Sequence, residues 1–129
     1  MIVALCVDNR MGLMFNRRRL SKDALLREKL LTISEGELRM SPYSAKQFEE
    51  EVYAGEDYLS GAAQNQWCFV ENDDYAAFSD RIEKIVLFQW NRDYPADLFF
   101  AFPGEWRLTC SEDFPGKSHE VITMEVYEK

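Results

Sequence analysis

Residues 84–90 are Lys84-Ile85-Val86-Leu87-Phe88-Gln89-Trp90, and this stretch decides the fold class of the chain. Four apolar residues follow one another in it, and two of them are β-branched. A continuous apolar run of this length is typical of a strand that is buried on both faces. The polar sequence Asn91-Arg92-Asp93-Tyr94-Pro95 bounds it. We therefore predict a buried strand over residues 84–90.

Two other stretches share this continuous apolar pattern. Residues 2–7 (Ile2-Val3-Ala4-Leu5-Cys6-Val7) and residues 67–70 (Trp67-Cys68-Phe69-Val70) predict two more fully buried strands. Leucines at helical spacing predict a helix over residues 22–33, with Ser21 as its N-cap. We expect shorter elements around these: a strand at 38–40, a helix at 44–53 that starts near Ser41-Pro42 and Ser44, a loop at 54–65 and a helix at 75–81.

The C-terminal part of the chain predicts an antiparallel hairpin. Residues 105–110 and 120–127 are rich in β-branched and aromatic residues, and they flank the turn sequence Phe114-Pro115-Gly116-Lys117. Strand and helix alternation followed by a hairpin predicts a three-layer α/β fold with a mixed sheet and flanking helices. At 129 residues, the chain is long enough for one core, so we expect a single domain over residues 1–129.

Charge limits the partners. The 15 basic and 23 acidic residues give a net charge of −8, which argues against binding to nucleic acid. Acids gather at Glu49-Glu50-Glu51, Glu56-Asp57, Glu71 with Asp73-Asp74, and Glu112-Asp113. These clusters are either solvated surface or a face for a basic protein partner. Likewise, Arg17-Arg18-Arg19 is either a solvated loop or an anion site.

The residues that bind metals are too few for a zinc site. His119 is the only histidine, and Cys6, Cys68 and Cys110 show no Cys-x-x-Cys spacing, so we expect three reduced, buried thiols and no metal. Acids at Asp8, Asp23, Glu71 and Asp73 would hold Mg²⁺ only by coincidence in so acidic a chain. We expect His119 to be a surface or hairpin residue, because no Ser or Cys nucleophile can be paired with it by sequence.

No window approaches the roughly 18 apolar residues of a membrane span. The start Met-Ile-Val-Ala-Leu has no basic region before it, so it does not have the form of a signal peptide. We expect a soluble, cytoplasmic protein without a membrane partner.

Two blocks of motifs, which cover about two-thirds of the chain, resemble the dihydrofolate reductase family. Val7-Asp8 followed by Gly12 resembles the exit of that family's first strand, and Leu20-Ser21-Lys22-Asp23 resembles its Leu-Pro-x-acid helix start. The acid of that motif binds the pterin ring in the family. Cys68-Phe69-Val70 followed by Tyr75-Ala76-Ala77-Phe78 resembles its strand, glycine turn and Tyr-x-x-Phe helix. The resemblance implies a shortened, dihydrofolate-reductase-like domain.

The cofactor residues of that family are missing. Glu71-Asn72-Asp73 replaces the glycines that let the backbone approach the pyrophosphate, and negative side chains there repel it. Ser41-Pro42-Tyr43-Ser44 replaces the residues for the cofactor phosphate, and the chain from Ser44 to Trp67 is too short for the adenosine cradle. Phe88 stands where the family has a threonine, and Arg17-Arg18-Arg19 lies where it has a tryptophan. We therefore expect no NADPH and no other cofactor.

The expected site is a cleft at the carboxyl ends of strands 2–7, 67–70 and 84–90. Asp23 is its main candidate, although an acid at a helix start is also an ordinary stabilising residue. If Asp23 lines a ligand site, Asp23→Asn should cost the fold at most about 1 kcal/mol. The resemblance places further ligand-binding positions at Ala4, Leu5, Val70, Tyr75 and Phe88.

Two classes of function follow. The first is a small-molecule binding protein for a planar heterocycle that does not use NADPH, and whether it also catalyses a reaction stays open. The alternative is an acidic protein–protein interaction module without catalysis, which has kept only the scaffold.

Overall fold

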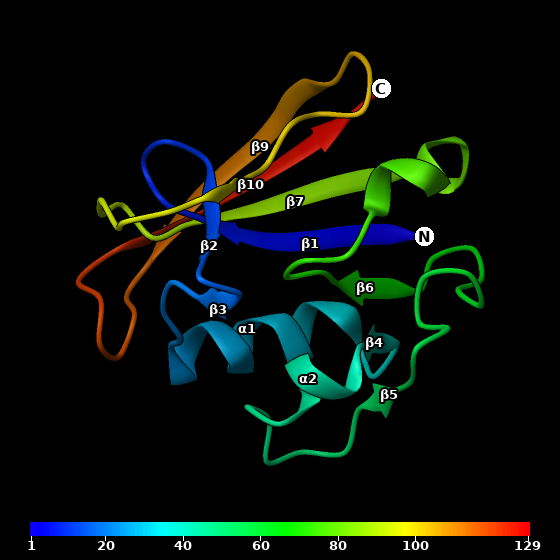
Figure 1. The fold of residues 1–129 in the computed structure, drawn as a ribbon, viewed down its shortest axis with the longest axis horizontal. Coiled ribbons are helices and arrows are strands. Elements are labelled where there is room, and N and C mark those ends of the chain that lie inside the picture. Colours follow the sequence, from blue (N-terminus) through cyan, green and yellow to red (C-terminus); the bar gives the residue numbers. More distant parts are fainter.

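The computed structural model describes all of residues 1–129. A seven-stranded mixed sheet has the order β5-β4-β6-β1-β7-β10-β9 (Figure 1). A separate three-stranded sheet has the order β3-β2-β8. The elements in chain order are β1 (Ile2–Val7), β2 (Gly12–Phe15), β3 (Arg18–Arg19), α1 (Ala24–Ser34), β4 (Leu38–Met40), α2 (Pro42–Ala45), β5 (Tyr53–Ala54), β6 (Trp67–Phe69), the 3₁₀-helix η1 (Tyr75–Arg81), β7 (Lys84–Gln89), β8 (Leu98–Phe99), β9 (Arg107–Phe114) and β10 (Ile122–Glu128).

The central strands confirm the prediction from the apolar runs. β1 lies between β6 and β7 and is parallel to both, with Val3 opposite Cys68 on one side and Ile85 on the other. Along β1 and β7 nearly every side chain is buried, because both faces of the sheet are covered. The chain is therefore an α/β protein whose sheet is mostly parallel.

The two faces of the sheet have different covers. Ile2 and Ala4 of β1 belong to a core under α1, which inserts Leu26 and Leu30. The alternate residues of β1 point to the opposite core, which is covered by the small sheet, η1 and the loop at 58–62. The predicted flanking helices are therefore present mainly on the first face, because the cover of the second face is mainly strand and loop and its only helix is η1.

The hairpin prediction is confirmed. β9 and β10 pair antiparallel at one edge of the sheet, and β10 also pairs antiparallel with β7 (Figure 1). β9 runs on to Phe114, so the connection between the strands is residues 115–121, which is longer than the tight turn that the sequence suggests. Almost every residue of β9 is exposed, as expected of an edge strand with little to pack against.

Two of the three helix predictions are wrong in their bounds, whereas the third, over 75–81, coincides with η1. The first helix begins at Ala24 and its N-cap is Asp23 rather than Ser21, because the Asp23 carboxylate accepts from the N–H groups of Leu25 and Leu26. The helix expected at 44–53 is only the four residues of α2, although Ser41 does cap it with Pro42 at its first position. Glu49, Glu50 and Glu51, which would have filled that helix, are exposed coil.

The small sheet of β3, β2 and β8 was not predicted from the sequence. β2 and β3 form a hairpin whose turn residues Asn16 and Arg17 have φ values of 50° and 62°. A two-residue turn with both φ values positive usually contains glycine, so Asn-Arg carries only a weak hairpin signal. The expectation of three buried thiols holds fully only for Cys68, because Cys6 is half-buried and Cys110, on β9, is exposed. None of the helices is long and apolar enough to cross a membrane.

Candidate functional site

A cleft lies at the carboxyl ends of the three central strands, where the sequence places the site. It has a volume of about 380 Å³ when its open mouth is counted, but its enclosed space is hardly larger than a water molecule. The cleft is therefore narrower than a usual small-molecule site. Its walls come from the end of β1, from the segment between β2 and α1, from the loop after α2, from the end of β6 and from the residue after β7. The lining residues are Cys6, Leu13, Arg19, Leu20, Ser21, Lys22, Asp23, Leu26, Arg27, Gln47, Phe69, Val70, Glu71 and Trp90.

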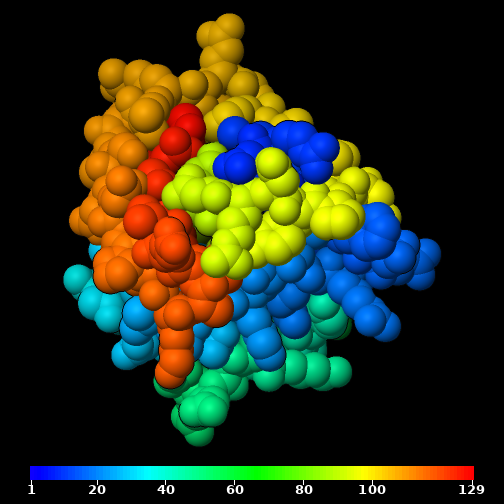
Figure 2. Space-filling view, turned by 90° about the vertical axis from the view of Figure 1, so that its left-hand side faces the viewer, coloured from blue at the N-terminus to red at the C-terminus, as the bar shows by residue number.

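Segments that are far apart in sequence meet beside this cleft. Figure 2 shows the loop after β1, the segment after β7 and the hairpin connection together on one face of the molecule. Hydrogen bonds join them: the Tyr94 N–H donates to Asp8, the Arg92 guanidinium donates to the carbonyl of Ser118, and the Asn91 amide donates to the carbonyl of Val121. The hairpin connection is thereby held against the end of β7.

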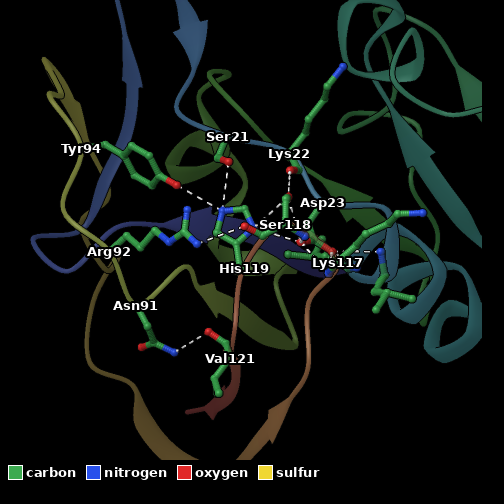
Figure 3. A network of polar contacts seen from close by, with 12 residues as sticks. Ser21, Lys22, Asp23, Asn91, Arg92, Tyr94, Lys117, Ser118, His119 and Val121 are labelled. Carbon is green, nitrogen blue, oxygen red and sulfur yellow. Dashed lines mark hydrogen bonds and ion pairs between the residues drawn. The ribbon is translucent and has the colours of Figure 1, made fainter.

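Asp23 ties the hairpin connection to the start of α1 (Figure 3). Its Oδ1 accepts from the N–H groups of Leu25 and Leu26 at 2.9 and 3.2 Å. Its Oδ2 accepts from the N–H groups of Lys117 and Ser118, each at 2.9 Å, and from the Ser118 hydroxyl at 3.2 Å. The side chain is only 2 % exposed. Asp23 is therefore anchored by the protein and has little capacity left for a ligand.

These donors also fix its charge. Burial, the largest influence, raises the pKa of the Asp23 carboxyl, but the hydrogen bonds from Lys117, His119 and Ser118 together outweigh it. The pKa of Asp23 therefore lies well below its usual range, and the group is an anion at neutral pH.

His119 is buried, contrary to the expectation of a surface residue, although it does lie in the hairpin connection. Its Nδ1 is 2.9 Å from Asp23 Oδ2, and its Nε2 is 3.0 Å from Ser21 Oγ and 3.1 Å from the Tyr94 hydroxyl (Figure 3). Because Nδ1 faces a carboxylate, it carries the proton in the neutral ring, and the lone pair of Nε2 is then available to either hydroxyl. The ring is stacked on Trp90 with centroids 4.5 Å apart.

Glu71 is the second carboxylate of the cleft, and it too is engaged. Arg19 binds it through two nitrogens, at 2.9 and 3.0 Å. The Ser44 hydroxyl donates to it at 2.7 Å and the Gln47 amide at 3.3 Å. Glu71 thus joins the end of β6 to α2 and to the hairpin of β2 and β3.

The two remaining charged groups of the cleft are cations without a partner. Arg27 lies one turn after Asp23 on α1, and its Nη1 is buried without any hydrogen-bond partner in the protein. Lys22 is exposed at the rim and forms no ion pair. Since both carboxylates are already engaged, the uncommitted charge in this cleft is positive, in a chain whose net charge is −8.

The expected site residues are only partly brought together. Asp23 and Val70 line the cleft, whereas Ala4, Leu5 and Phe88 lie in the two cores with no exposed surface. Tyr75 lies on the other face, where its hydroxyl donates to the carbonyl of Ala101 and its ring is stacked on that of Phe100. Sequence reasoning did not assign Ser21, Arg27, Gln47 and Trp90 to the site. The run Arg17-Arg18-Arg19 indicated Arg19 as a possible anion-binding residue, and the altered turn drew attention to Glu71. No sequence pattern indicated Arg27.

Neither the Cys6 thiol nor the acids considered for Mg²⁺ forms a reactive or metal-binding group. Burial is the main cause that raises the pKa of the Cys6 thiol well above its usual value, so Cys6 is a neutral thiol. The acids considered for Mg²⁺ are separate: Asp8 accepts from the backbone of its own turn, and Asp73 accepts from the Tyr58 hydroxyl. Nowhere do three His, Cys, Asp or Glu side chains gather as a metal site requires.

No protein-family model matches this chain, and no curated protein matches it either.

Proposed function

We propose that the chain binds a small planar ligand with a negatively charged group in this cleft, without NADPH. Arg27 carries the proposal, because a guanidinium nitrogen that is buried without an acceptor is costly unless a ligand supplies one. A carboxylate or phosphate is the natural partner of a guanidinium. Trp90 and Phe69 supply flat apolar surface in the same walls. Since the cleft is narrow, a ring can enter only if side chains of its walls move apart.

The scaffold that we propose is a shortened, dihydrofolate-reductase-like one. A parallel centre with an antiparallel C-terminal hairpin supports this proposal, as does the place of Asp23 at the start of the first helix. The arrangement of Asp23 departs from what the resemblance implies, because its carboxylate is bound by the hairpin connection. We therefore assign recognition of the ligand to Arg27 and Lys22 rather than to Asp23.

The environment of Glu71 supports the proposal that NADPH is not used. Four side-chain hydrogen bonds hold this carboxylate at the turn where a pyrophosphate would have to approach. A titration with NADPH followed by calorimetry should show no saturable heat. Binding in the micromolar range, about 8 kcal/mol, would contradict this part of the proposal.

A thermal-shift screen with matched pairs of heterocycles tests the proposal. Pterin with pterin-6-carboxylate and quinoline with quinoline-3-carboxylate differ only in the anionic group. The acid of a pair should stabilise the wild type more than the neutral compound does. Arg27→Gln should remove that difference, because it keeps a polar side chain but loses the charge.

Arg107→Gln is the matched control, since Arg107 is an exposed arginine on β9, far from the walls of the cleft. It should respond like the wild type. If the acids give the same shift in the wild type and in Arg27→Gln, the proposed role of Arg27 is wrong. If no compound stabilises the wild type, the cleft is not a ligand site for this class.

The second candidate function is the acidic interaction module, and β9 favours it. This eight-residue strand is at the end of the sheet order, so its outer backbone groups have no strand partner. A basic segment could add to this edge beside Glu112 and Asp113. If no heterocycle stabilises the wild type but a basic strand peptide binds to it, this second function is favoured.

A further inference from the structure

We propose that Ser21, His119 and Asp23 form a nucleophilic triad that cleaves an ester whose acyl group occupies the cleft. The inference rests on the proposed function only in needing a ligand to enter the cleft. It adds a reaction to what would otherwise be a binding site.

The geometry of the three side chains carries the proposal (Figure 3). Asp23 Oδ2 is 2.9 Å from His119 Nδ1, and His119 Nε2 is 3.0 Å from Ser21 Oγ. Both distances lie within the roughly 2.6–3.2 Å that a nucleophile, its base and the group that orients the base require. Ser21 and Asp23 line the cleft, so the nucleophile lies where a ligand would be.

Asp23 has the features of the orienting group in such a triad. It is buried and ionised, and it receives several donors besides the imidazole, so it holds the proton of His119 on Nδ1 without taking it. This tautomer leaves the lone pair of Nε2 pointing to Ser21. The stacking of the ring on Trp90 fixes its plane.

The Tyr94 hydroxyl shares Nε2 with Ser21, at 3.1 Å. As long as the ring is neutral, the two hydroxyls compete for one lone pair. Once Nε2 has taken a proton, the Tyr94 oxygen can accept it as a hydrogen bond. Tyr94 therefore weakens the base in the resting protein and stabilises the imidazolium that follows.

The reaction balances without a cofactor. Ser21 Oγ forms a bond to the ester carbonyl carbon, and its proton passes to His119 Nε2. When the C–O bond to the leaving alcohol breaks, that proton goes to the alkoxide. Water then attacks the acyl-serine with the same base, which releases the acid and restores the hydroxyl of Ser21.

The charge that develops on the carbonyl oxygen needs hydrogen-bond donors, and two backbone N–H groups next to Ser21 in the chain are uncommitted. The backbone N–H groups of Lys22 and Asp23, which directly follow the nucleophile, donate to no acceptor in the protein. Arg27 and Lys22 add positive charge in the same cleft. Such donors stabilise an oxyanion most in a site that holds little water.

Covalent labelling tests the triad. A fluorophosphonate probe incubated with the whole chain should modify Ser21, located by peptide mass spectrometry, and p-nitrophenyl acetate should be turned over. Ser21→Ala should abolish both signals, and His119→Gln should slow both at least about 100-fold. Ser21→Ala keeps the contact between Asp23 and His119, so its fold is retained. Ser111→Ala, at an exposed serine of β9, should label and react as the wild type does.

Absence of label on Ser21, or hydrolysis that persists in Ser21→Ala, would overturn the triad. Its failure is separable from that of the binding function, because the effect of the acidic heterocycles depends on Arg27. If these compounds still stabilise the wild type while Ser21 stays unlabelled, the cleft binds a ligand but the triad is wrong. Labelling without any heterocycle effect would support the triad and contradict the proposed ligand class.

Discussion

Asp23 shows how much of a residue's role depends on partners that are distant in sequence. The sequence places it at the start of a helix, where it is either a ligand contact or an ordinary capping acid. The structure makes it the cap of α1 and also the acceptor for Lys117, Ser118 and His119. These partners are more than ninety positions away, and no local pattern contains them.

The contacts change the expected cost of Asp23→Asn. An amide in place of the carboxylate accepts through one oxygen only, and its NH₂ group faces N–H donors either at α1 or at the hairpin connection. We therefore expect a loss of about 3 kcal/mol in the free energy of unfolding, rather than the 1 kcal/mol expected for a simple helix start. Urea unfolding followed by circular dichroism measures it, with the exposed Asp80→Asn as control. A loss below about 1 kcal/mol for Asp23→Asn would show that the network contributes little.

The lowered pKa of Asp23 predicts that the fold loses stability in acid, and the lowered pKa of Asp8 adds to this loss. Burial raises the pKa of Asp8, but hydrogen bonds from the N–H groups of Tyr94, Gly12 and Arg10 lower it below the usual value. A carboxyl whose pKa is lower in the folded than in the unfolded state stabilises the fold above its unfolded pKa of about 3.9. That contribution is lost as the pH falls through this value toward the folded pKa.

Unfolding in urea at pH 6, 5, 4 and 3 should therefore show stability that is nearly constant at first and then falls steeply below about pH 5. Asp8→Asn should be less stable at pH 6, and its profile should be flatter at low pH. Parallel profiles for the wild type and Asp8→Asn would contradict the assignment of the lowered pKa to Asp8.

At the scale of elements, the long apolar strands could be predicted and the short pieces could not. β1, β6 and β7 are buried on both faces, so their sequences alone carry the signal. β2 contributes Leu13 and Met14 to a core built by distant strands, whereas both residues of β8 are exposed, and nothing in their four and two residues requires them to pair. The start of α1 was missed because two residues, Ser21 and Asp23, could each cap it, and Asp23 also accepts from Lys117 and Ser118 in the distant hairpin connection.

The hairpin connection was correctly expected near Pro115-Gly116, but the need for glycine has a different cause. Gly116 does not have a positive φ. A Cβ there would lie 2.7 Å from the carbonyl oxygen of His119 and 2.8 Å from Asp23 Oδ2. The connection can therefore approach α1 only because this side chain is missing.

Gly116→Ala should thus push the connection away from Asp23, with a loss of about 1–3 kcal/mol in the free energy of unfolding. In the Asp23→Asn background, Gly116→Ala should lower the free energy of unfolding by less, because the contact between the hairpin connection and residue 23 is already weakened. A double-mutant cycle in urea measures this coupling. Additive losses would show that Gly116 and Asp23 act independently.

At the scale of the whole molecule, the charge of the cleft differs in sign from that of the chain. The net charge is −8, yet both carboxylates in the cleft are engaged and Arg27 and Lys22 are not. Composition alone predicted an acidic surface. It could not locate the positive charge of the cleft, because that charge depends on which acids are already paired. The location of the cleft could be predicted from the strand ends, but its ligand chemistry could not.

An NMR titration shows directly whether this cleft is a ligand site. Amide and indole signals of the ¹⁵N-labelled chain are followed during titration with pterin-6-carboxylate and quinoline-3-carboxylate. We expect saturable shifts that cluster at Ser21–Arg27, at Glu71 and at the indole of Trp90, and that vanish in Arg27→Gln. Shifts confined to β9 and the exposed acids, or no shifts at all, would contradict this expectation.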